Sequence, residues 1–183
     1  MLCMSTQTVP ASSTSSAPAP RWAVWAAHAT TWAVLPSGLW RIALVLGHPA
    51  GYTEEGFADF RSPGAKVWML ALSVVCECVA LLTIGLVRPW GEVVPRWIPW
   101  LGGRAVRPMA AVVPAALGAV ALTVLWADVP RWWTYSHHDM TDTGSLVVGI
   151  LYQPLVLWGP LTGAVTVSYY RRRRPRGRRV RSA

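Results

Sequence analysis

Charge is the scarcest property of this sequence. Only 14% of its 183 residues are Asp, Glu, Lys or Arg, roughly half of the ~25% that is typical of soluble domains. Acids are the rarer sign, with 8 Asp and Glu against 17 Lys and Arg. Hydrophobic residues make up 53% and occur in long blocks. This balance argues against an ordinary soluble domain and favours an all-α protein that crosses a membrane several times.

Cysteine is also scarce, and the 3 present do not amount to a disulfide framework. Cys76 and Cys78 lie two positions apart in an apolar run, so a helix would point them to nearly opposite sides. We interpret both as small residues buried in the core. The sequence also lacks a Ser-His-Asp pattern, a glycine-rich phosphate loop, HExxH and CxxC. These absences favour a non-catalytic protein without a cofactor over an enzyme.

The apolar runs predict four transmembrane helices, at about 22–46, 67–87, 109–126 and 145–170. At ~1.5 Å per residue each approaches or exceeds the ~30 Å of a hydrocarbon core. We expect them to form a bundle of two helical hairpins, a transmembrane domain covering residues 21–170. Pro36 predicts a kink in the first span, and Pro154 and Pro160 predict breaks in the fourth.

The two ends of the chain differ from this domain in composition. Residues 1–20 carry no charge and are rich in Ser, Thr, Ala and Pro, so we expect a disordered N-terminal tail. Residues 171–183 form an arginine-rich tail.

Basic residues are distributed unequally between the two sides that four spans would create. One side would hold Arg21, four arginines of the connector Arg88–Pro108 and eight of the C-terminal tail, 13 in all. The other would hold Arg61, Lys66 and Arg131. Because positive loops stay inside, both termini are predicted to be cytoplasmic, with the protein in the cell membrane.

The arginines of the connector and tail are predicted to bind anionic lipid headgroups, each contributing ~1 kcal/mol near the surface. Nucleic-acid binding by the C-terminal tail is disfavoured, because no aromatic residues are interleaved with its arginines and no fold presents them. The predicted lipid-binding residues are Arg88, Arg96, Arg104, Arg107, Arg171, Arg172, Arg173 and Arg174.

Glu77 is the residue most out of place, because it falls at the centre of the second span. A carboxylate there should be protonated or paired. It is either a proton-accepting or cation-binding site, or a structural acid bonded to a neighbouring helix. Arg41 in the first span is its natural partner, unless its side chain extends outward to the interface. His28 lies on another face of that span, as a packing residue or a proton relay.

Two further groups of residues invite a functional interpretation. His137, His138 and Asp139 offer imidazole and carboxylate ligands. Their spacing matches no zinc framework, so no metal site is predicted. Gly159 and Gly163 form a GxxxG pattern, which we interpret as packing within the bundle, with contact between copies as the alternative.

Three segments resemble a group of small actinobacterial integral membrane proteins with no assigned function: GLWRIAL (38–44), RPWGEVVPRWIPWLGGR (88–104) and WGPLTGAVTVSYYRRR (158–173). The resemblance covers most of residues 21–174 and implies a four-helix protein of the cell membrane, with no catalytic residues to carry over. The sequence as a whole predicts a non-catalytic envelope component that contacts anionic lipid or a protein partner, with a second copy or another membrane protein as candidates. The alternative is a small transporter or channel-like protein that uses Glu77 and Arg41.

Overall fold

The computed structural model describes residues 18–91, 93 and 102–174, and within these ranges the chain is helical with no strands. Two isolated β-bridges, Tyr52 with Met140 and Val93 with Ala105, join loops. The elements in order are α1 (Arg21–Val45), α2 (Glu54–Ala58), α3 (Pro63–Gly85), η1 (Pro89–Gly91), α4 (Pro108–Trp126), η2 (Val129–Thr134), α5 (Asp142–Tyr152), η3 (Gln153–Leu157) and α6 (Trp158–Arg173). Most of the predicted N-terminal tail lies outside the described residues.

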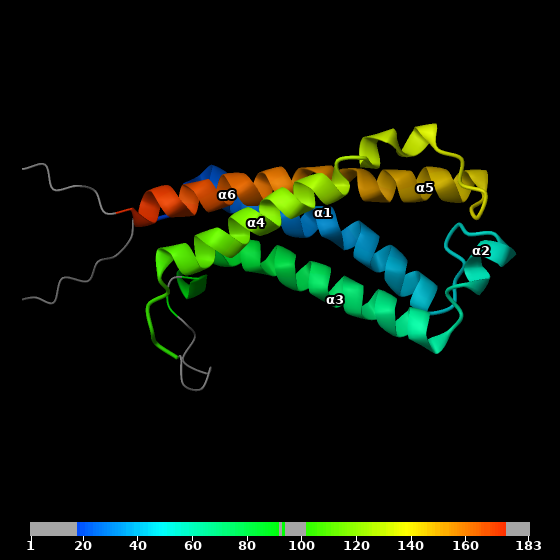
Figure 1. The fold of residues 1–183 in the computed structure, drawn as a ribbon, viewed down its shortest axis with the longest axis horizontal. Helices are drawn as coiled ribbons and strands as arrows, with labels where there is room; N and C mark the ends of the chain where they lie inside the picture. The colour runs from blue at the N-terminus through cyan, green and yellow to red at the C-terminus, as the bar shows by residue number, and fades with distance from the viewer. Residues whose placement is uncertain (1–17, 92, 94–101, 175–183) are drawn as a thin grey trace, which may run out of the picture.

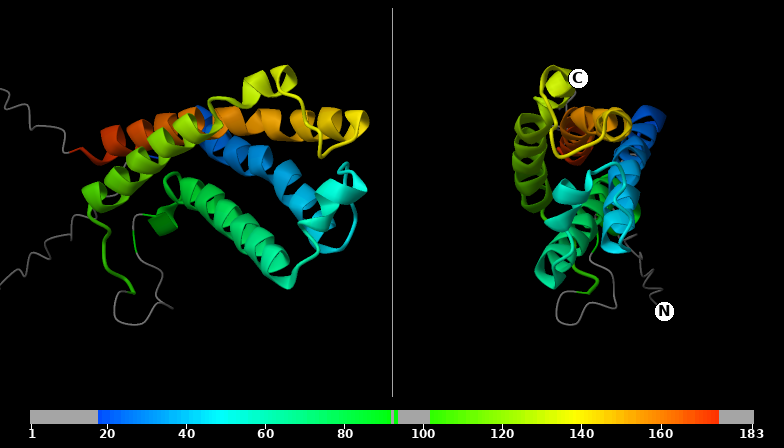
Figure 2. Two further views of the ribbon diagram at one scale, coloured as in Figure 1. Left: turned by 45° about the vertical axis from the view of Figure 1, so that its right-hand side comes forward. Right: turned by 90° about the vertical axis from the view of Figure 1, so that its right-hand side faces the viewer.

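The long helices form an arc in the order α3, α1, α6, α4 (Figures 1 and 2). Helix α1 packs along α3 on one side and along α6 on the other, and α4 packs across α6. Contact between α3 and α4 is slight although they follow one another in the chain. Each hairpin is therefore built from neighbouring helices, and the interface of α1 with α6 holds the two hairpins together.

Local sequence explains where the helices begin and where one of them breaks. Ser62 caps α3 by accepting a hydrogen bond from the Ala65 amide at 3.1 Å, and Pro63 occupies the first turn. Helix α3 therefore starts four residues before the predicted span. Helix α1 continues through Pro36. The chain breaks instead around Pro154, where η3 separates α5 from α6.

The core consists of three clusters along the length of the bundle. Leu44, Phe57 and Met69 form one at the end that carries α2. Val34, Ala80, Leu155 and Trp158 form the second at mid-length. The third, at the opposite end, contains Ala27, Leu86, Val165 and Tyr169. Every cluster includes a residue of α1, so this helix is the element around which the others pack.

Three stretches are long and apolar enough to cross a membrane: Pro63–Gly85, Pro108–Thr134 and Asp142–Arg173. Only 6% of the apolar window in the second stretch is buried inside the protein. An apolar surface of this extent requires an apolar environment. Helix α1, which contains the predicted span 22–46, falls outside this set because Arg41, His28 and its hydroxyl residues lower its hydropathy.

The two cysteines of α3 differ in their surroundings. Cys76 is partly buried and packs against the mid-length cluster, whereas Cys78 is exposed. The interpretation of both as core residues was therefore wrong for Cys78. Residues two apart on a helix point to nearly opposite sides, so only one of the pair can face the core.

Two loops at the α2 end are paired across the bundle. The Thr53 amide donates to the Asp139 carbonyl at 2.9 Å, and the Thr141 amide donates to the Gly51 carbonyl at 3.0 Å. The backbones of Gly51 and Gly144 approach so closely that a Cβ on Gly144 would collide with Gly51. This pairing joins the loop after α1 to the loop before α5 and closes that end of the bundle.

Candidate functional site

Arg41 is buried at mid-bundle, with 5% of its surface exposed. Its Nε donates to the Ser73 hydroxyl of α3 at 3.0 Å. Its Nη atoms lie 3.5 Å from the hydroxyls of Tyr152 and Ser37. Ser73 donates its own proton to the Met69 carbonyl at 2.9 Å, so its lone pairs face the guanidinium. Arg41 thus links α1 to both α3 and α5.

Glu77 lies one helical turn beyond Ser73 and rests against Gly38 of α1. A Cβ on Gly38 would come within 3.1 Å of the Glu77 carboxylate, so the glycine makes room for it. The expected Arg41–Glu77 ion pair within 4.0 Å is absent from the described residues, although the positive charge of Arg41 acts on the carboxyl. The residue of α3 that pairs with Arg41 is Ser73 and not the predicted Glu77. Within the described chain the half-buried Glu77 carboxyl makes no hydrogen bond.

Aromatic residues surround this polar group on the α5 side. Tyr152 lies between Trp40, at 5.7 Å between ring centroids, and Trp126, at 6.0 Å. The buried indole N–H groups of Trp126 and Trp158 have no hydrogen-bond partner among the described residues. Sequence reasoning missed Tyr152; the available indication was a hydroxyl residue directly before the break at Gln153 and Pro154. The arrangement supplies a fixed positive charge beside a carboxyl that is able to take up a proton.

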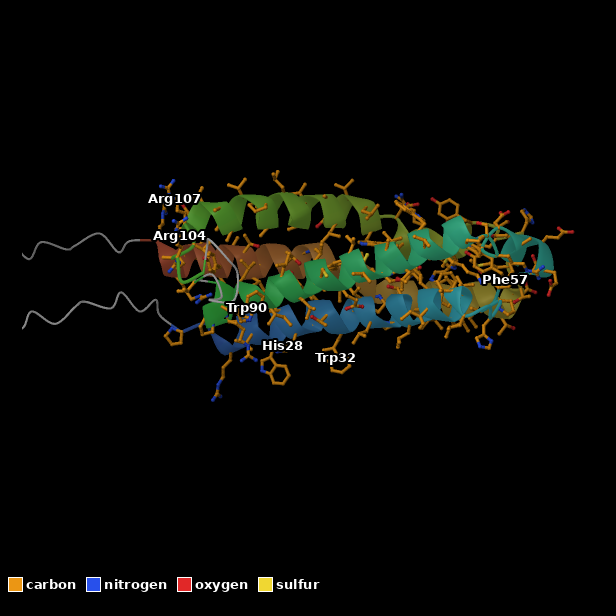
Figure 3. All side chains as sticks on the ribbon, turned by 90° about the horizontal axis from the view of Figure 1, so that it is seen from below. His28, Trp32, Phe57, Trp90, Arg104 and Arg107 are labelled. Carbon is orange, nitrogen blue, oxygen red and sulfur yellow. The ribbon has the colours of Figure 1, made fainter. Side chains whose placement is uncertain are left out.

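His28 is separate from this group and lines a groove of about 380 Å³ on the outer side of α1. Its Nδ1 lies 2.7 Å from the Val24 carbonyl, and because a carbonyl only accepts, Nδ1 carries the proton. Trp25 and Trp32 line the same groove and are 76% and 72% exposed. Figure 3 shows His28 and Trp32 on one side of α1. The structure therefore does not bring His28 to Arg41 or Glu77.

Two of the three weak candidates for metal ligation make other contacts in the structure. The His137 ring stacks on Trp132 at 3.8 Å between centroids. The Asp139 backbone carbonyl accepts from Thr53 in the loop pairing. Nowhere in the described ranges do three or more His, Cys, Asp or Glu residues form a group that could hold a metal ion.

Burial, and secondarily the Asp139 charge, raise the pKa of the half-buried Tyr52 to about 12.

The predicted lipid-binding arginines divide into two groups. Arg172 donates to the Leu86 carbonyl at 2.7 Å, and Arg173 donates to the Val106 carbonyl at 2.9 Å. These bonds tie α6 to the C-cap of α3 and to the end of the connector that precedes α4. The exposed group consists of Arg88, Arg104, Arg107, Arg171 and Arg174, and Arg96 lies outside the described residues.

Charge is strongly segregated along the bundle. Arg104 and Arg107 lie at the end opposite Phe57 (Figure 3). The described residues of the arginine end include no acid, whereas six acids lie at the α2 end, in the loops and the first turn of α5. Glu77, at mid-bundle, is the remaining acid in the described ranges. Glu92 of the connector, the eighth acid of the chain, lies outside the described residues, and the described part of the arginine end carries positive charges only.

The GxxxG glycines face α4. A Cβ on Gly159 would lie 2.5 Å from the Thr123 amide nitrogen and 2.7 Å from the Ala119 carbonyl oxygen. A Cβ on Gly163 would lie in ordinary contact, 3.7 Å from Ala119. The backbones of α4 and α6 thus approach closely at Gly159, and this face of α6 is used within the chain.

Comparison with known proteins adds no identification: no protein-family model, curated protein or solved structure matches the chain. The site is therefore described by its geometry alone.

Proposed function

We propose that the chain is a non-catalytic, four-span protein of the cell membrane that holds anionic lipid headgroups at its cytoplasmic, arginine-rich end. The observation that carries the proposal is the segregation of charge along the bundle. Five exposed arginines share one end of the chain, and the residues described at that end include no acid; Glu92 of the connector lies outside the described residues. At the other end Arg61 and Arg131 are paired with Glu54 at 2.6 Å and Asp128 at 3.1 Å.

Helix α1 is part of the proposed spanning domain although its hydropathy is low. Its polar residues Thr30, Ser37 and Arg41 are all buried against other helices. Its outward residues include Trp22, Trp25, Trp32 and Leu39, which suit an apolar surrounding. A helix of 25 residues extends ~37 Å, which is long enough to cross a ~30 Å core. Burial of its polar groups by protein is what supports a fourth span.

Lipid composition around the purified protein tests this proposal. The full chain is placed in nanodiscs of phosphatidylcholine and phosphatidylglycerol, and the salt-dependent enrichment of phosphatidylglycerol around it is measured. The double variant R104Q/R107Q should reduce the enrichment, because each exposed arginine attracts the anionic leaflet. The matched variant R61Q/R131Q should leave it unchanged, since those charges are already paired. Equal loss in both variants, or no enrichment in the unmodified protein, would refute the proposal.

A second candidate is a small transporter or channel-like protein, favoured by the unpaired Glu77 carboxyl beside buried Arg41. Such a site could accept and release a proton without breaking a hydrogen bond of the described chain. In proteoliposomes with an internal pH-sensitive dye, E77Q would then abolish proton flux while thermal stability is retained. The control E54Q, at an exposed loop acid, would leave flux unchanged. No flux in the unmodified protein excludes proton transport.

A further inference from the structure

The groove on the outer side of α1 has walls from two antiparallel segments. Trp25, His28 and Trp32 of α1 form one wall, and Pro154, Leu157 and Leu161 form the other. Pro154 on the second wall belongs to η3, the 3-10 segment that separates α5 from α6. His28 donates its Nδ1 proton to the Val24 carbonyl of its own helix. The other residues that line the groove are Trp, Ala, Pro and Leu, so both walls are predominantly apolar. The groove therefore offers space for a hydrocarbon chain.

An exposed arginine lies beyond each wall, toward the arginine end. Arg21, Trp25, His28 and Trp32 are spaced at i, i+4, i+7 and i+11, which places them on one face of α1. On α6, the exposed Arg171 follows the wall residue Leu161 by ten residues and lies about 80° further round the helix.

The contact between the helices fixes the relative height of the two arginines. Ala27 of α1 packs in one cluster with Val165 of α6. Arg21 precedes Ala27 by six residues, and Arg171 follows Val165 by six. Since α1 and α6 run in opposite directions (Figure 1), both arginines lie ~9 Å beyond this contact, at the same end. Two exposed positive charges thus lie at the same end of the bundle, beyond the residues that line the groove.

We propose that this groove binds one anionic glycerophospholipid, with an acyl chain between the walls and its phosphate between Arg21 and Arg171. Guanidinium groups suit phosphate because their planar donors bind two oxygens together. A transmembrane helix or a second copy would cover the walls but would leave both arginines without an anionic partner. The inference rests on the proposed function, since it requires a membrane protein with anionic lipid at its arginine end. It goes further by assigning one discrete site with a fixed lipid.

The test uses the full chain extracted from the same nanodiscs and examined by native mass spectrometry, which counts retained phosphatidylglycerol. The unmodified protein should retain one molecule under detergent conditions that remove the rest. A29W places an indole in the groove at an exposed alanine and should displace this molecule. A116W is the matched control, because Ala116 is an exposed alanine of α4 and, like Ala29, lies eight residues after the first residue of its helix.

Charge variants separate the site from the general attraction of the arginine end. R21Q/R171Q should weaken retention roughly 25-fold, at about fivefold for each arginine. R104Q/R107Q should leave the retained molecule in place while it lowers the overall enrichment. If A29W and A116W act alike, if both charge variants release the lipid equally, or if the retained mass is a second copy, the site is refuted. In those outcomes the proposed function stands as long as phosphatidylglycerol is still enriched.

Discussion

The hydrogen bond between Arg41 and Ser73 should be the strongest polar link between α1 and α3. It is the shortest contact of the guanidinium, at 3.0 Å, and both residues are buried. Hydrogen bonds to charged groups contribute ~1.5–3 kcal/mol in soluble proteins, whereas side-chain pairs measured in a membrane protein average ~0.6 and reach ~1.7 kcal/mol. For this buried contact we expect a coupling free energy of about 1–1.5 kcal/mol.

A double-mutant cycle measures this coupling. The free energy of unfolding is determined in mixed micelles for R41M, S73A and the double variant. Ser37, whose hydroxyl lies 3.5 Å from Arg41, provides the comparison, and the R41M/S37A cycle should give a smaller coupling. The R41M/E77Q cycle should also be smaller, because no direct ion pair joins those residues. Effects of R41M and S73A that add within ~0.5 kcal/mol would contradict this account of the interface.

Three further predictions follow from single positions. G159A should destabilise the protein by about 1–3 kcal/mol, because its Cβ meets the backbone of α4, whereas G118A, with open space around it, should be neutral or stabilising in the same unfolding assay. The pKa of Tyr52 is raised to about 12, so the folded state favours the protonated phenol. The contribution of this phenol to the free energy of unfolding should be complete below pH ~10 and should be lost as the pH rises toward 12. Y52F should lack that part of the decline in stability. R172A should accelerate amide exchange in the last turn of α3, because its carbonyl partner, Leu86, is the C-cap of that helix, and R174A should not.

The sequence was sufficient for the helices and for the charge asymmetry, because both depend on composition over long windows. It was insufficient at prolines: the pattern predicts breaks at both Pro154 and Pro160, yet the chain breaks around the first while α6 includes the second, in its first turn. Tertiary contacts decide whether the lost hydrogen bond is tolerated.

The details of the site depend on how each helix is rotated about its axis. Periodicity places Ser73 and Glu77 on the same side of α3 but does not say which of them Arg41 reaches. The pairing of Thr53 with Asp139 joins residues far apart in sequence, and no local sequence pattern predicts it. Likewise, a run of arginines predicts a positive surface but not that Arg172 and Arg173 bind backbone carbonyls.

The orientation of the chain is the most direct test of the account as a whole. Topology reporters are fused at Gly56, in the loop of α2, and at Gly177, in the arginine-rich tail. The account predicts that the reporter at Gly177 lies in the cytoplasm and the one at Gly56 lies outside, because the arginine end faces the anionic inner leaflet. An external reporter at Gly177, or two reporters on the same side, would contradict it.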